Sequence, residues 1–200
     1  MLLRSLPIVL ALTLSAGATA VQAQTQTPAA VGAAEIRAIA ERETLWCAGW
    51  DDADQSCESL ALYRPSTERA GEIDESVMLQ IAAAPEVRLV VYGASRFEGD
   101  RLCTDYAVAD VRVVVLIDGT PADEDVAAPV VAVFEEAMAE FEGKRICTRY
   151  LRVAEDRLRD EVTVDGARRE DLESEYRLFP FDRAPRLRAP GGPDLDTSQA

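Results

Sequence analysis

The sequence predicts an α+β fold: a mostly antiparallel β-sheet of about seven to nine strands, with one long amphipathic helix packed on a face and disulfides bracing the domain. Three observations predict it. Many short segments alternate apolar with polar residues, as strands with one covered face do. One stretch instead repeats its apolar residues every three or four positions, as a helix does. The chain also carries four cysteines, an even number, behind an export-like N-terminus.

Residues 1–23 have the composition of a secretory signal peptide. Arg4 gives a positive start, an apolar stretch follows, and small-residue cleavage patterns end at Ala20 and Ala23. The apolar stretch is shorter than the roughly 18 to 20 residues of a spanning helix, which disfavours an uncleaved anchor. We therefore expect cleavage after Ala23, a periplasmic or extracellular location, and no membrane insertion of the mature chain.

Three further segments follow the signal peptide. Residues 24–32 are typical of a short polar leader, and residues 33–179 are long enough for a single globular domain with its own core. Residues 180–200 contain four prolines and two adjacent glycines, so a disordered tail is expected there. Its arginines make it locally basic, which fits either an idle terminus or a contact with an anionic envelope polymer.

The first half of the domain predicts one short helix and four strands. Residues 33–42 place Ile36, Ile39 and Ala40 on one side of a helix. The expected strands are 45–50, 57–63, 77–81 and 87–92, the first two joined by a polar turn over 51–55.

The second half predicts four strands around the long helix. Residues 111–117 are almost all β-branched and end at a turn, Asp118-Gly119. Residues 125–142 form the helix, with Pro129 tolerated in its first turn. Its apolar stripe consists of Val130, Phe134, Met138 and Phe141. Strands are expected at 145–153, 161–164 and 173–179, the last two joined through Asp165-Gly166.

Two segments, 83–106 and 127–150, form a candidate internal repeat. Eleven of their 24 aligned positions are identical, which indicates either a real unit or coincidence among common residue types. Their middle parts differ in period, so the shared feature is the exit, Phe-Glu-Gly before a cysteine-bearing strand. We expect Gly99 to reverse the chain and Gly143 to end a helix, both at positive φ.

The cysteines predict two disulfides rather than free, catalytic or metal-binding thiols. Of three connectivities we favour Cys47–Cys57, across a hairpin, and Cys103–Cys147, at equivalent positions of the repeat. If the two repeat strands are adjacent, Asp105 meets an arginine in either strand direction and one arginine pair is left opposed. The bridge would then lie on a charged, partly wet face, opposite Tyr106 and Tyr150, which should be packed.

Charge and composition exclude several functions. The formal net charge is −15, and removal of Arg4 with the signal peptide makes it −16, which disfavours nucleic acid and anionic membrane surfaces. The chain has no histidine, so catalytic triads and histidine metal sites are excluded. Catalysis by paired carboxylates remains possible, but nothing distinguishes Glu58, Asp74 and Glu75 from the other acidic residues.

No metal or cofactor is expected. Asp52, Asp54 and Ser56 match the first ligands of a calcium loop, but Cys57 stands where that loop needs glycine. A second acidic group is better explained as a turn followed by a helix N-terminus, and consists of Asp118, Asp123, Glu124 and Asp125.

Three classes of function fit these observations. The one we favour is an exported, non-catalytic binding or envelope-associated module that holds a partner or small ligand in or beside its sheet, with no catalytic residue assigned. The alternatives are an acidic inhibitor or binder of a cationic exported protein, and a carboxylate-dependent hydrolase.

Overall fold

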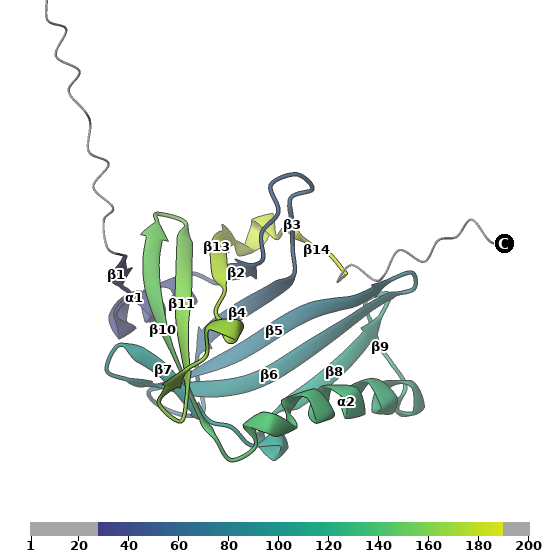
Figure 1. Ribbon diagram of the computed structural model, residues 1–200. Coiled ribbons are helices and arrows are strands. Elements are labelled where there is room, and N and C mark those ends of the chain that lie inside the picture. Colours follow the sequence, from purple (N-terminus) through teal and green to yellow (C-terminus); the bar gives the residue numbers. More distant parts are fainter. Residues whose placement is uncertain (1–27, 190–200) are drawn as a thin grey trace, which may run out of the picture.

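The computed structural model describes residues 28–189, and about half of them belong to one twelve-stranded sheet (Figure 1). Its strands pair antiparallel, and two α-helices, α1 (Ala33–Glu41) and α2 (Glu124–Met138), accompany it. The twelve strands are β1 (Ala29–Ala30), β2 (Thr44–Ala48), β4 (Ser59–Pro65), β5 (Glu72–Ala83), β6 (Glu86–Glu98), β7 (Arg101–Asp105), β8 (Arg112–Ile117), β9 (Thr120–Pro121), β10 (Arg145–Ala154), β11 (Arg157–Val164), β12 (Ala167–Arg168) and β13 (Glu175–Pro180). Two further strands, β3 (Ser56–Cys57) and β14 (Arg186–Leu187), form a separate parallel pair. The α+β class is confirmed.

The expected count of seven to nine strands is wrong. Several of the additional strands, such as β1, β9 and β12, are two residues long, which is too short for an alternating pattern to signal. Strand ends were also missed, because β5 already begins at Glu72 and β6 continues to Glu98. Charged side chains are frequent in both added stretches, and they interrupt the apolar alternation by which a strand is recognised.

Eight of the strands close into a ring. β7 pairs with β6 on one side and with β10 on the other, so the order β6, β5, β4, β2, β13, β11, β10, β7 returns to its start. Every pairing around this ring is antiparallel. Closure leaves the ring strands without a long free edge, which removes a common route to aggregation.

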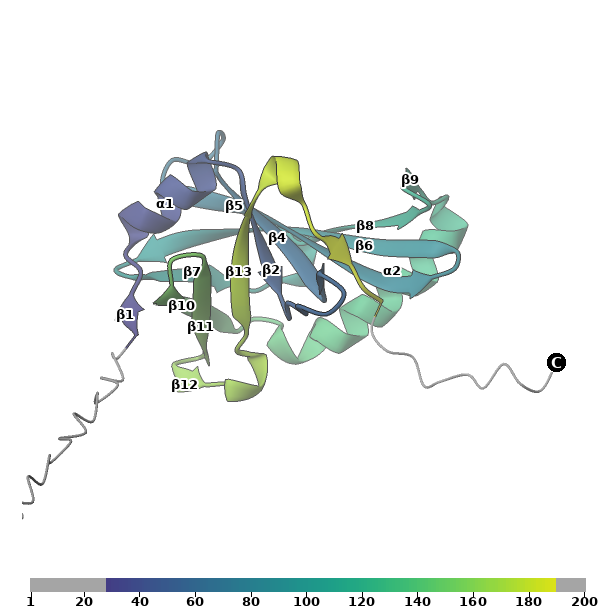
Figure 2. The ribbon, with the colours of Figure 1, turned by 90° about the horizontal axis from the view of Figure 1, so that it is seen from above.

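An aromatic cluster fills the inside of this ring. The ring of Trp46, which is fully buried, lies 4.8 Å from that of Tyr63, 4.9 Å from Tyr150 and 5.9 Å from Tyr176, all edge-on. Such contacts add about 0.5–1.5 kcal/mol each beyond simple burial. The confirmed short helix α1 adds Ile36 and Ile39 to the same core, and it lies away from α2 (Figure 2).

Helix α2 covers less of the sheet than its stripe predicts. It ends at Met138 and passes into a short 3-10 helix, η2 (Ala139–Phe141), rather than continuing to residue 142. No side chain of α2 is fully buried, and Val133 is 67% exposed. The helix contacts β8, a strand outside the ring. The expectation of a helix laid across a sheet face is therefore met only at the sheet's margin.

Both repeat exits have the expected geometry. Gly99 (φ 65°) turns β6 into β7, and Gly143 (φ 71°) follows η2 and leads into β10. Cys103 lies directly opposite Cys147 in the β7–β10 pair, and the two form a disulfide, as do Cys47 and Cys57. Before the exits the copies differ, since one is the strand β6 and the other the helix α2.

The surroundings of the Cys103–Cys147 bridge are as charged as expected but drier. Arg145 pairs with Asp105 at 2.6 Å, and Arg101 stands opposite Arg149, which instead bonds Asp100 at 2.8 Å. Cys103 itself is only 2% exposed, so a wet bridge is wrong for that sulfur.

The two ends of the domain are more ordered than composition predicts. In the expected polar leader, β1 pairs with β10 and Val31 is buried. In the expected disordered tail, residues 181–189 form a 3-10 turn, η4 (Phe181–Arg183), and then β14, which pairs in parallel with β3. Backbone partners on other strands stabilise both segments, and no local pattern reports such partners.

Some predictions concern residues that the structure does not describe. The signal peptide 1–23, the cleavage site after Ala23 and residues 190–200 of the tail lie outside the described residues. Within residues 28–189, neither α-helix is long and apolar enough to span a membrane.

Candidate functional site

A cleft of about 790 Å³ opens beside β6, at the break between its pairing with β8 and its pairing with β7. On that side β6 pairs with β8 as far as Tyr92 and with β7 from Arg96 onward. Residues 93–95 therefore have no strand partner there, although β5 pairs with them on the other side. The chain leaves β7, passes the 3-10 helix η1 (Val108–Asp110) and enters β8, so it frames the gap.

Gly93 keeps the middle of this cleft open. It lies within β6 without a positive φ, so the backbone does not require glycine at this position. A Cβ atom built on it would meet nothing within 4 Å. Glycine inside a strand costs roughly 0.5–1 kcal/mol relative to alanine, and it often marks a close approach by a ligand or another backbone. Here the space above Gly93 belongs to the open cleft.

Glu75 lies directly across from Gly93, at the inner end of the cleft. In the sheet register Glu75 pairs with Gly93 on β6 and with Tyr63 on β4, so all three share the inner face of the ring. Glu75 is half-buried and takes part in no ion pair among residues 28–189. Burial raises the pKa of the Glu75 carboxyl, and a hydrogen bond from the Ser95 hydroxyl partly offsets this.

Neutral hydroxyl groups surround the buried side of Glu75. The Tyr63 and Tyr150 hydroxyls share a hydrogen bond of 3.0 Å. Burial, with the nearby Glu75 carboxylate as a further cause, raises the pKa of both phenols, so they stay protonated. The carboxyl therefore has polar neighbours on the inside of the ring but no positive charge.

The lining of the cleft combines apolar side chains with an excess of acidic ones. The walls are formed by Val77, Val91, Val111, Phe134 and Met138. The lining also holds six carboxylates (Glu68, Glu72, Asp74, Glu75, Asp105, Asp110) and three arginines (Arg69, Arg96, Arg112), a net charge of −3. A molecule in the cleft is thus exposed to a negative field as well as to apolar side chains.

The arginines at the mouth are already engaged with other groups. Arg69 bonds Glu72 at 2.8 Å, and Arg96 bonds Asp105 at 3.1 Å. Arg112 lies 4.1 Å above the ring of Tyr92, which points to the outer face of β6. These cations therefore hold the rim, and they do not neutralise Glu75.

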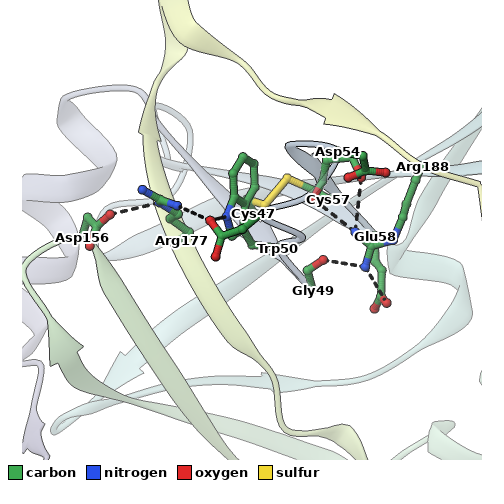
Figure 3. The surroundings of a disulfide bond; sticks show 11 residues. Cys47, Gly49, Trp50, Asp54, Cys57, Glu58, Asp156, Arg177 and Arg188 are labelled. Carbon is green, nitrogen blue, oxygen red and sulfur yellow. Dashed lines mark hydrogen bonds and ion pairs between the residues drawn. A yellow bond between two sulfur atoms is a disulfide. The ribbon is translucent and has the colours of Figure 1, made fainter.

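The three acids that sequence reasoning named separate in the structure. Asp74 and Glu75 are consecutive in β5, so they lie on opposite faces, and Asp74 approaches Arg69 at 3.8 Å. Glu58 lies elsewhere, beside the Cys47–Cys57 disulfide, where it pairs with Arg188 (Figure 3). Sequence reasoning missed Gly93, and the available signal was a lone glycine just past an alternating strand.

Asp160 is a second interior carboxylate, but its bonds are satisfied. It is 2% exposed, and it accepts hydrogen bonds from the Ser174 backbone N–H and the Tyr176 hydroxyl, the latter at 2.9 Å. Burial raises the pKa of this carboxyl, and those two hydrogen bonds work against the rise. Asp160 does not line the cleft, and we assign it a structural role.

The surroundings of the Cys47–Cys57 disulfide are also explained by structure alone (Figure 3). Arg188 donates to the Gly49 carbonyl at 2.7 Å and to Glu58 at 2.9 Å, which ties the C-terminal segment to this loop. Arg177 lies 5.1 Å from the ring of Trp50 and bonds Asp156 at 3.1 Å.

Neither acidic group considered for calcium forms a site. Asp52 accepts from the Trp50 indole at 2.7 Å, and Asp123 precedes α2, with Glu124 and Asp125 in its first turn. The residues described hold no cluster of three or more potential metal ligands.

Comparison with known proteins gives no assignment: no protein-family model, no curated protein and no solved structure matches the chain.

Proposed function

We propose that the protein is an exported, non-catalytic binding module that holds a small ligand in the Glu75 cleft. The observation that carries this proposal is the open space at Gly93, which faces an interior carboxyl group across the sheet. A cleft of about 790 Å³ has the size of known ligand sites, which span roughly 300–1,000 Å³. Apolar side chains beside an interior carboxyl group, as this lining has them, are also typical of such sites.

The chemistry of the cleft favours binding over catalysis. The chain has no histidine, and the acid next to Glu75 in sequence faces the other side of the sheet. The inner end therefore offers one carboxyl group with tyrosine and serine hydroxyls beside it, and no paired acid and base. The two disulfides are compatible with the export that we propose.

Filling the cleft tests this function. The full chain, produced in a bacterial periplasm, is compared under native and denaturing mass spectrometry for a retained small molecule. We expect a retained mass in the unaltered protein that is lost from Gly93→Leu, because the new side chain occupies the cleft. Gly32→Leu is the matched control, since Gly32 also has open space and no positive φ but lies at the start of α1.

Two results would count against the proposal. One is equal retention of the small molecule by Gly93→Leu and the unaltered protein. The other is the absence of any retained molecule together with no thermal stabilisation of the unaltered protein by a diverse compound library.

A further inference from the structure

We infer that the ligand is an organic amine, whose ammonium group pairs with Glu75 while its apolar body lies along the wall formed by Phe134 and Met138. This inference rests on the proposed function and specifies the class of ligand. It follows from the unpaired state of one carboxylate inside a cleft.

A half-buried carboxylate without a cation is costly. Charged groups that leave water need a partner, and the usual outcome is an ion pair or a raised pKa. The carboxylates at the rim have such partners, as Glu72 has Arg69 and Asp105 has Arg96. Among residues 28–189, Glu75 has the Ser95 hydroxyl as its partner and no cation, although three arginines line the same cleft. A ligand cation would supply the partner that the chain does not.

The groups that face Glu75 leave room for a cation and for no second anion. Tyr63 of β4 and Tyr150 of β10 are neutral phenols, and Gly93 and Ser95 of β6 carry no charge. Asp160 is a further acid within the ring, and its charge also acts on Tyr63. A carboxylate or phosphate ligand would be repelled by these groups and by the net −3 charge of the lining.

The apolar walls of the cleft indicate the chemistry of the rest of the ligand. Val77 and Val91 are paired neighbours on β5 and β6, and Phe134 and Met138 lie one helical turn apart on α2. These side chains are half-buried rather than packed away, so apolar surface is open to a ligand. An aromatic or branched hydrocarbon body of modest size would cover this surface.

Binding of an amine should also be linked to protons. Because burial raises the pKa of Glu75, its carboxyl takes up a proton at a higher pH than an exposed glutamate does. An ammonium group requires the ionised form, so its affinity should fall as the pH drops through the Glu75 pKa. A neutral ligand of the same shape should show no such dependence, because the phenols around Glu75 stay protonated throughout.

Three probes that share one body separate the possibilities: 4-phenylbutylamine, 4-phenylbutan-1-ol and 4-phenylbutyrate. Isothermal titration calorimetry measures each against the full chain, Glu75→Gln, and the control Glu161→Gln, which makes the same change at a half-buried glutamate of β11 that does not line the cleft. We expect the amine to bind roughly ten- to a hundredfold more tightly than the alcohol, as a charge-assisted hydrogen bond provides. This preference should disappear in Glu75→Gln and persist in Glu161→Gln.

Equal affinity for amine and alcohol, tightest binding of the carboxylate, or no binding of any probe would overturn the inference. The proposed binding function is judged separately by the small molecule that Gly93→Leu should lose. If Glu75→Gln fails to fold, the pH dependence on the unaltered chain decides. An amine affinity that does not weaken at low pH relative to the alcohol would then refute the pairing with Glu75.

Discussion

Removal of the disulfide that joins β7 to β10 should destabilise the protein more than removal of the other bridge. Cys103 and Cys147 are 44 residues apart, and Cys47 and Cys57 are 10 apart. On the loop-entropy model these loops correspond to about 4 and about 3 kcal/mol of stability. For a chain of 200 residues, 4 kcal/mol lowers the midpoint of thermal unfolding by about 8–16 °C.

The structure adds a local consequence to this global one. β7 is held by five residue pairs to β10 and by three to β6, and it completes the ring. Without the bridge, β7 should open more often, and amide hydrogens at Leu102 and Thr104 should exchange faster. Cys103 also lines the cleft, so ligand retention should weaken in parallel.

Urea unfolding of two double variants, Cys103→Ala with Cys147→Ala and Cys47→Ala with Cys57→Ala, tests the difference. Fluorescence of the buried Trp46 reports unfolding. We expect the first variant to lose about 1 kcal/mol more than the second on the same model. A smaller loss in the first variant, or unchanged exchange in β7, would refute the view that this bridge secures the ring.

Three further changes have defined outcomes. Glu75→Gln should raise the free energy of unfolding at neutral pH. The folded protein binds the Glu75 proton more tightly than the unfolded chain, so the unaltered protein loses stability as pH rises. In urea unfolding the gain in Glu75→Gln should vanish at low pH, and a gain that grows with acidity would contradict this. Asp160→Ala should cost about 2–3 kcal/mol in the same assay, because two buried donors lose their acceptor, whereas the half-exposed Asp156→Ala should cost at most about 1 kcal/mol; equal losses would argue against a buried network. Arg188→Ala should change stability by less than about 1 kcal/mol but expose residues 186–189 to limited proteolysis, since its bonds hold this segment; unchanged cleavage would show that β14 pairing suffices.

The sequence was most informative where chemistry is local. Cysteine number and spacing predicted both disulfides, and the Phe-Glu-Gly exits predicted two glycines at positive φ. Closure of the ring through β7 was not predictable, because it depends on pairing with strands far apart in the chain. Alternation alone separates Asp74 from Glu75. Which of the two faces the interior is fixed by the register of β5 with its neighbours, and the register is a property of the sheet.

The repeated motif places its two cysteines on a local two-fold axis. In the antiparallel β7–β10 pair, Asp105 lies opposite Arg145 and Arg101 opposite Arg149, so a local two-fold axis passes through the disulfide. In such a pair only the residue on the axis meets its own equivalent. The two copies can therefore form a bridge only if each cysteine stands at that position, the same distance after its exit turn.

The parts in which the two copies differ line the cleft. The first copy contributes the β6 residues around Gly93 to the cleft, and the second contributes Phe134 and Met138 of α2. The similar C-terminal parts of the two copies are thus joined by the Cys103–Cys147 disulfide, and the dissimilar middle parts, in β6 and α2, form two walls of the cleft. If this is correct, substitutions at the exits should reduce stability and ligand retention together, whereas Gly93→Leu should reduce retention alone.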